Sequence, residues 1–190
     1  MTVFEFTIIL WSIMFSIAIA HMLASVADLV RVGGRVKISG VHALWMLSVF
    51  VCVLANWLSV WDLRLLTHWT TGYILFLTLA TVLQYFACVL ISPPAPEEGA
   101  IDLRAFHQTQ GPRYLAAFAL LNFYSIPLNI LTAQLFGVAS WGWQSLAQGP
   151  AAALTLLAIF AKPRWAQWAL AVAVLTLSAF YLTSLQGELK

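Results

Sequence analysis

Long apolar runs that few charged residues interrupt constrain this chain more than any other feature of its sequence. Charged residues occupy 8% of its 190 positions and hydrophobic residues 62%, and the mean hydropathy is +0.90. A soluble domain carries roughly 25% charged residues, because its water-facing surface requires them. Most of this chain's surface must therefore face lipid, and the expected fold class is an all-α polytopic membrane protein.

Hydropathy divides the chain into six expected spans within a single transmembrane domain, residues 1–190. A span needs roughly 20 apolar residues to cross a hydrocarbon core about 30 Å thick. The apolar segments lie near residues 3–30, 40–61, 68–91, 113–137, 144–161 and 164–186. Only the loop 92–112 is long, and within it residues 103–107 are expected to form a short interfacial helix.

The distribution of Lys and Arg predicts the orientation of this six-helix bundle. The loops after spans one, three and five hold seven of these residues: Arg31, Arg35, Lys37, Arg104, Arg113, Lys162 and Arg164. The opposite side holds two, Arg64 and Lys190. Because cytoplasmic loops carry the excess of Lys and Arg, we expect the seven in the cytoplasm and both termini on the extracytoplasmic side.

Polar residues recur at helical spacing along each of the first four spans. The set comprises His21, Ser25, Asp28, His42, Asn56, Gln84, Asn122, Ser125 and Asn129. Polar groups inside a membrane are costly, so they face the bundle interior or a wet cavity. The sequence therefore predicts that spans one to four share a polar interior. Spans five and six carry no ionisable residue between Gln148 and Ala161 or between Trp165 and Leu185, and they would pack outside it or against another protomer.

Two interpretations of these polar stripes remain open. They either line a path for a solute or ion, or they hold the helices together through hydrogen bonds worth about 0.6 kcal/mol each. By depth, His21, Asp28, His42 and Gln84 would form one cluster on the cytoplasmic side. His21 is the least easily explained as a structural residue, because a titratable side chain is uncommon at that depth.

Other functional classes find little support in the sequence. There is no HExxH, GxSxG, P-loop or glycine-rich dinucleotide motif, so we predict no catalytic residues, metal ligands or cofactor. The net charge of +2, without a basic aromatic patch, argues against nucleic acid as a partner. Haem binding is a weaker alternative that would require paired histidines at one depth, and only His21 with His42 comes close.

Several short motifs resemble a widespread family of small, uncharacterised bacterial six-span proteins. They are the stretch Val41-His42-Ala43-Leu44-Trp45, Asn56-Trp57 followed by Trp61-Asp62-Leu63-Arg64, Leu90-Ile91-Ser92-Pro93-Pro94, and Ile101-Asp102-Leu103-Arg104-Ala105-Phe106-His107. Members of this family tend to have two adjacent tryptophans where this chain has Asn56-Trp57. The resemblance implies a six-span fold in the bacterial inner membrane and carries no established activity.

The leading functional hypothesis is transport or channel-like passage of a small solute or ion through the interior of spans one to four. The alternative is a non-catalytic scaffold or accessory subunit. Such a protein would bind its own copies or other membrane proteins through spans five and six, where Ala169 and Ala173 form a small-xxx-small pair. In either case the lipid bilayer is the expected partner of the remaining surface.

Overall fold

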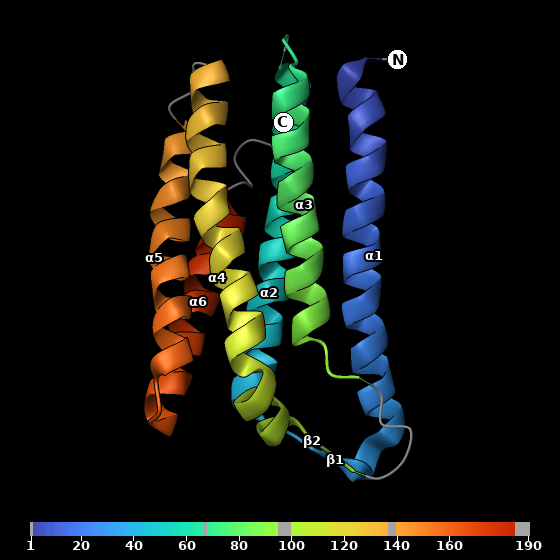
Figure 1. Cartoon of the computed structure of the whole chain (residues 1–190), viewed down its shortest axis with the longest axis vertical. Coiled ribbons are helices and arrows are strands. Elements are labelled where there is room, and N and C mark those ends of the chain that lie inside the picture. Colours follow the sequence, from blue (N-terminus) through green and yellow to red (C-terminus); the bar gives the residue numbers. More distant parts are fainter. Residues whose placement is uncertain (1, 67, 95–99, 137–139, 185–190) are drawn as a thin grey trace.

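A computed structural model of the chain describes residues 2–66, 68–94, 100–136 and 140–184. Within these ranges the chain forms six long helices that run side by side and alternate in direction (Figure 1). The helices are α1 (Val3–Val32), α2 (Gly40–Ser59), α3 (Thr71–Ile91), α4 (Leu103–Phe136), α5 (Ser140–Phe160) and α6 (Arg164–Ser184). Short 3₁₀ turns follow two of them, η1 (Gly33–Arg35) and η2 (Val60–Leu65).

In the described part of the chain, five helices are long and apolar enough to cross a membrane: α1, α2, α3, α4 and α6. The chain is therefore built as a multi-pass membrane protein, as its composition predicts. α5 coincides with the expected fifth span, but its described apolar stretch, Leu146–Phe160, is shorter. The count of six spans and the side of the membrane on which the termini lie stay predictions.

Capping residues set the starts of the first three helices. Thr2 and Glu5 form a capping box at α1, in which each side chain accepts from the other residue's backbone N–H, at 3.1 and 2.8 Å. The hydroxyls of Ser39 and Thr70 cap α2 and α3. α1 ends at Gly33, whose φ of 56° lies in a region that L side chains rarely adopt.

Two short strands join the loops at one end of the bundle. β1 (Val36–Lys37) pairs in parallel with β2 (Ile101–Asp102), with Val36 opposite Ile101 and Lys37 opposite Asp102. The residues after β2 differ from the expectation. Residues 103–112, assigned to a loop with a separate interfacial helix, instead form the first turns of the 34-residue helix α4. The expected helix is present, but it is continuous with the span.

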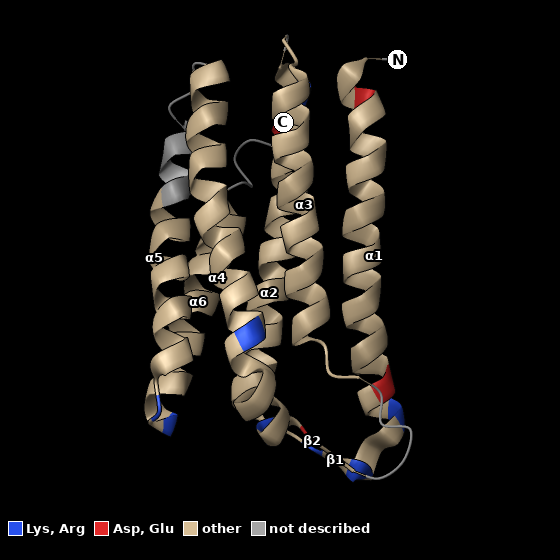
Figure 2. Cartoon of the chain, viewed as in Figure 1, with Lys and Arg blue, Asp and Glu red and all other residues tan. Residues whose placement is uncertain are grey.

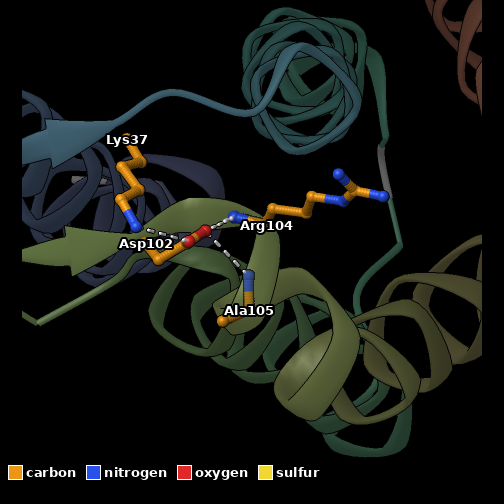
Figure 3. Close-up of polar contacts among 4 residues, drawn as sticks. All are labelled: Lys37, Asp102, Arg104 and Ala105. Atoms are coloured by element: carbon orange, nitrogen blue, oxygen red, sulfur yellow. Dashed lines mark hydrogen bonds and ion pairs between the residues drawn. The ribbon is translucent and has the colours of Figure 1, made fainter.

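Asp102 joins the strand pair to the start of α4 (Figure 3). Its Oδ1 accepts from the backbone N–H of Arg104 at 2.9 Å and of Ala105 at 3.1 Å, which caps the helix. Its Oδ2 lies 3.7 Å from Nζ of Lys37. The bond from Ala105, together with that from Arg104 and the Lys37 ammonium, holds the pKa of the Asp102 carboxyl below its usual value. One carboxylate thus links the α1–α2 connection to α4.

The helices do not pack as the polar stripes predict. α4 packs most extensively on α5, and α2 packs on α6, which in turn packs on α5. α1 lies at the edge, chiefly against α3 (Figure 1). The expectation that α5 and α6 are peripheral is therefore wrong, and α1 holds the outer position. Their expected contact with another protomer stays a prediction.

Positive charge gathers at one end of the bundle, which we call the basic end. Figure 2 shows Lys and Arg at the loops that join α1 to α2, α3 to α4 and α5 to α6. The seven residues counted for orientation all belong to these loops or to the adjoining turns. In the described part of the chain, Arg64 alone among the Lys and Arg residues lies at the opposite end, in η2, 3.6 Å from Asp62.

Asp102→Ala should lower the thermal unfolding midpoint of the detergent-purified protein, because it removes both the cap of α4 and the Lys37 ion pair. Asp102→Asn keeps a capping oxygen and should cost less. A lowered native pKa means that the stabilisation is present at neutral pH and is lost as the pH falls through that lowered pKa. An alanine variant with the native midpoint at neutral pH would contradict this role.

α2 approaches α6 closely at Gly40, where an added Cβ would lie 2.4 Å from Cη2 of Trp168. Gly40→Ala should therefore reduce the free energy of unfolding by about 1 kcal/mol, at the low end for overpacking, because the half-exposed indole can shift. The matched control is Gly72→Ala in α3, where a Cβ meets nothing within 4 Å. Denaturant titration should show no loss there, and Trp168→Leu should restore the stability of Gly40→Ala.

Candidate functional site

A cavity of about 50 Å³, with a wall that is largely apolar and carries a set of polar side chains, lies within the bundle in the half away from the basic end. Its polar lining consists of amides and hydroxyls from α2, α3, α4 and α5, with Tyr181 from α6. These residues are Asn56, Ser59, Thr81, Gln84, Ser125, Asn129, Thr132 and Gln148. A water molecule needs roughly 10–15 Å³ of such space, so the cavity has room for about three.

Amide pairs across neighbouring helices build this cavity. Nδ2 of Asn56 on α2 donates to Oε1 of Gln84 on α3 at 2.7 Å. Nδ2 of Asn129 on α4 donates to Oε1 of Gln148 on α5 at 2.8 Å. Asn56 and Gln84 also donate to the Sγ atoms of Cys52 and Cys88, at 3.6 and 3.9 Å. Each amide carries a carbonyl oxygen and two N–H groups, so every member keeps some hydrogen-bonding capacity. The arrangement can hold a small molecule that both donates and accepts hydrogen bonds.

Charge is excluded from this cavity. Among the described residues that line it there is no Asp, Glu, Lys, Arg or His. On the side of the basic end, large side chains that are at most 1% exposed fill the bundle, including Trp45, Tyr114 and Phe118. The 3₁₀ turn η2 contributes Val60 and Leu63 on the other side. The cavity therefore lies close to one end of the bundle and is shut off from the other.

The structure brings together four of the nine residues that the sequence singles out: Asn56, Gln84, Ser125 and Asn129. Asn122 lies next to them, where its Nδ2 donates to the Phe118 carbonyl at 2.8 Å. It lines a smaller space of about 10 Å³, to which Gln148 also contributes. Gln84, expected by depth in the cytoplasm-side cluster, instead lies here beside Asn56.

The expected cytoplasm-side cluster does not form. His21 is exposed on the outer face of α1, and Asp28 pairs with Arg31 at 3.1 Å. Ser25 is buried, and its hydroxyl donates to the carbonyl of Pro93 at 2.7 Å, which ties α1 to the end of α3. Helical spacing placed these three on one face of α1, but that face turns only partly inward because α1 has a single close neighbour.

His42 is fully buried in a different setting. Its ring meets the rings of Phe106 and Tyr114 on α4 edge-on, with centroids 5.2 and 5.8 Å away. Its two ring nitrogens have no hydrogen-bond partner among the described residues. His21 and His42, the pair considered for haem, therefore occupy different environments. In the described ranges no group of three or more His, Cys, Asp or Glu residues is placed to hold a metal ion.

A larger pocket of about 450 Å³ lies at the basic end, between the starts of α2, α4 and α6 and the end of α5. We call it the basic pocket. Its cationic side chains are Arg104, Lys162 and Arg164, and no acidic residue is among the described residues that line it. Within the described ranges none of the three forms an ion pair. The starts of α2, α4 and α6 add the positive ends of three helix dipoles, against the negative end of α5.

Neutral polar groups complete the basic pocket. Ser39, His107, Gln108 and Gln167 are among its lining residues. His107 hydrogen-bonds through Nδ1 to the hydroxyl of Tyr114. Gln167 donates to the carbonyls of Ala158 and Ala161 at 2.7 and 2.8 Å, which satisfies the end of α5. A pocket with three cations and several hydrogen-bonding groups can bind an anion.

Sequence reasoning missed two parts of these sites. The polar residues singled out from the sequence do not include Gln148, although an amide in an apolar helix is itself a signal of an interior position. Arg104, Lys162 and Arg164 enter the sequence argument only through orientation, because their convergence depends on how the α3–α4 and α5–α6 connections meet. Comparison with known proteins places neither site in a family: no family model, no curated protein and no solved structure matches the chain.

The amide pairs can be tested by a double-mutant cycle on Asn129 and Gln148. Each single change to Leu leaves a buried amide without its partner and should reduce the free energy of unfolding by about 1–3 kcal/mol. The double change removes both groups and should cost less than the sum of the singles. Denaturant titration in detergent measures all four proteins. Strictly additive losses would mean that the two amides do not interact.

Proposed function

We propose that the protein moves a small, uncharged polar solute across the membrane through the cavity between α2, α3, α4 and α5. The observation that carries the proposal is the lining of that cavity by four amides and four hydroxyls, without a charged side chain in its described part. These groups come from four helices and can meet a solute that both donates and accepts hydrogen bonds, beside an apolar wall that includes Trp11, Phe15 and Leu77. An ion would require charged groups or several converging carbonyls for its dehydration.

The dimensions of the cavity limit the solute. A volume of about 50 Å³ takes three waters or a molecule of a few heavy atoms. Passage to the basic end would require the side chains of Trp45, Tyr114 and Phe118 to move, since they close the bundle there. The proposal is therefore of a binding site near one end of the bundle, between η2 and a closed aromatic layer, both of which rearrange during transport.

Three further parts of this proposal come from the sequence. The excess of Lys and Arg at the basic end supports placing that end in the cytoplasm, with both termini outside. α5 would then also cross the membrane and bring the number of spans to six. The resemblance to small bacterial six-span proteins supports a location in the bacterial inner membrane. A scaffold that assembles through α5 and α6 is the less favoured alternative, because both helices are packed into the bundle on α2 and α4.

The test is solute entry into proteoliposomes, followed by light scattering after an osmotic step with urea or glycerol. Native protein should speed the entry of at least one such solute over empty liposomes. The double variant Asn129→Leu/Gln148→Leu makes the cavity apolar and should reduce that rate at least about tenfold, because the solute loses hydrogen-bonding partners.

The matched control is Thr176→Leu, a similar change on the exposed outer face of α6. It should keep the native rate. Water, K⁺ and protons complete the panel. Native protein that conducts none of these species would refute the transport class. A selective K⁺ or proton flux, or a native rate in the double variant, would refute the proposed solute and site.

A further inference from the structure

An apolar groove lies beside the basic pocket. This hollow of about 610 Å³ separates α1 from α2 at the basic end. Apolar side chains make up nearly all of its wall: Met22, Leu23, Val26, Leu29, Val30, Val36, Ile38, Ala43, Met46, Leu47, Phe50 and Leu103. The groove exists because α1 packs chiefly on α3 and touches α2 much less. Along α2 it extends over residues 43–50, which is about 10 Å of helix.

The groove and the basic pocket meet at one residue. Ile38, in the connection between β1 and α2, lines both hollows. Its side chain is 81% exposed, so the two hollows are adjacent on the surface at Ile38. A ligand that crosses Ile38 meets three cations on one side and an apolar channel between two helices on the other. Only an amphipathic molecule satisfies both parts at once.

We propose that the basic end binds an anionic phospholipid, with its phosphate headgroup in the basic pocket and an acyl chain in the groove between α1 and α2. This site is separate from the transport cavity, and the inference does not rest on the proposed function. The charges are complementary: the unpaired cations Arg104, Lys162 and Arg164 face a headgroup that carries a negative charge. Arg guanidinium groups also match phosphate oxygens geometrically.

Other occupants fit less of the surface. A free phosphate or a soluble phosphate ester would fill the basic pocket and leave the groove without an apolar occupant. A neutral lipid would fill the groove and leave the three cations unpaired, and a zwitterionic headgroup brings a positive charge of its own. Basic pockets between transmembrane helices at the cytoplasmic side are known to bind anionic lipid headgroups. The combination of both hollows therefore selects the anionic lipid.

Lipid retention by the full-length protein in detergent tests the charge requirement. Native mass spectrometry should show phosphatidylglycerol bound at least tenfold more tightly than phosphatidylcholine. Arg104→Gln, Lys162→Gln and Arg164→Gln should each weaken phosphatidylglycerol binding about fivefold. Arg31→Gln, an equal charge change at the same end but outside the pocket, should change it less than twofold. Equal binding of the two lipids, or equal losses in all four variants, would overturn the proposal.

A second arm tests the groove. Ala43→Trp places an indole in the groove and should reduce phosphatidylglycerol binding at least tenfold, while Ala179→Trp on the exposed face of α6 should leave it unchanged. Glycerol phosphate and inorganic phosphate should bind native protein far more weakly than the lipid. If glycerol phosphate binds as tightly as the lipid and Ala43→Trp has no effect, the site holds a soluble anion and the lipid proposal fails.

The lipid-binding measurement remains informative even if one of the variants fails to fold. Lys162 lies in the turn between α5 and α6, outside both helices, so Lys162→Gln should be tolerated whatever happens to the other variants. Arg104→Lys and Arg164→Lys keep the charge and should retain most of the preference for phosphatidylglycerol. A loss of that preference in the lysine variants as large as in the glutamine variants would mean that charge does not hold the headgroup.

Discussion

Lipid offers no hydrogen-bond partners, so polar groups in the interior of this bundle are stabilised only by partners within the protein. The amide pairs Asn56–Gln84 and Asn129–Gln148 are the main result of that constraint. Each pair joins two helices, and together they tie α2 to α3 and α4 to α5. Other Ser, Thr and Asn side chains donate hydrogen bonds to backbone carbonyls of their own helix, as Ser125 and Asn122 do. The cavity is the space left where amides and hydroxyls of several helices converge but do not all pair with one another.

The same constraint separates the two sites chemically. Charged side chains stay at the ends of the helices, where water and headgroups can solvate them, and amides and hydroxyls occupy the interior. A layer of buried aromatic residues, including Trp45, Tyr114 and Phe118, divides the neutral cavity from the basic end. The proposed solute site and the proposed lipid site can therefore coexist in one small bundle, since neutral groups lie in its interior and the cations at its end.

The position of α1 links the fold to the lipid proposal. α1 leans on α3, and three polar contacts near the basic end anchor it: Ser25 to the carbonyl of Pro93, the β1–β2 pair, and Lys37 to Asp102. Held in this way, α1 stands apart from α2 and leaves a groove open to the bilayer. A bound acyl chain would fill that groove and add contacts between α1 and the rest of the bundle.

Local sequence determined the helices and their starts: apolar length, Thr2, Ser39 and Thr70 as caps, and the charge that marks the basic end. It also indicated Asn56, Gln84, Ser125 and Asn129 as interior residues, because helical spacing shows which residues share a face. Spacing does not show what that face meets. Only the tertiary structure decided that α1 is peripheral, that His21 is exposed and that Gln148 completes the cavity. It alone brought Arg104, Lys162 and Arg164 into one pocket, because neighbours that are distant in sequence are chosen by packing between helices.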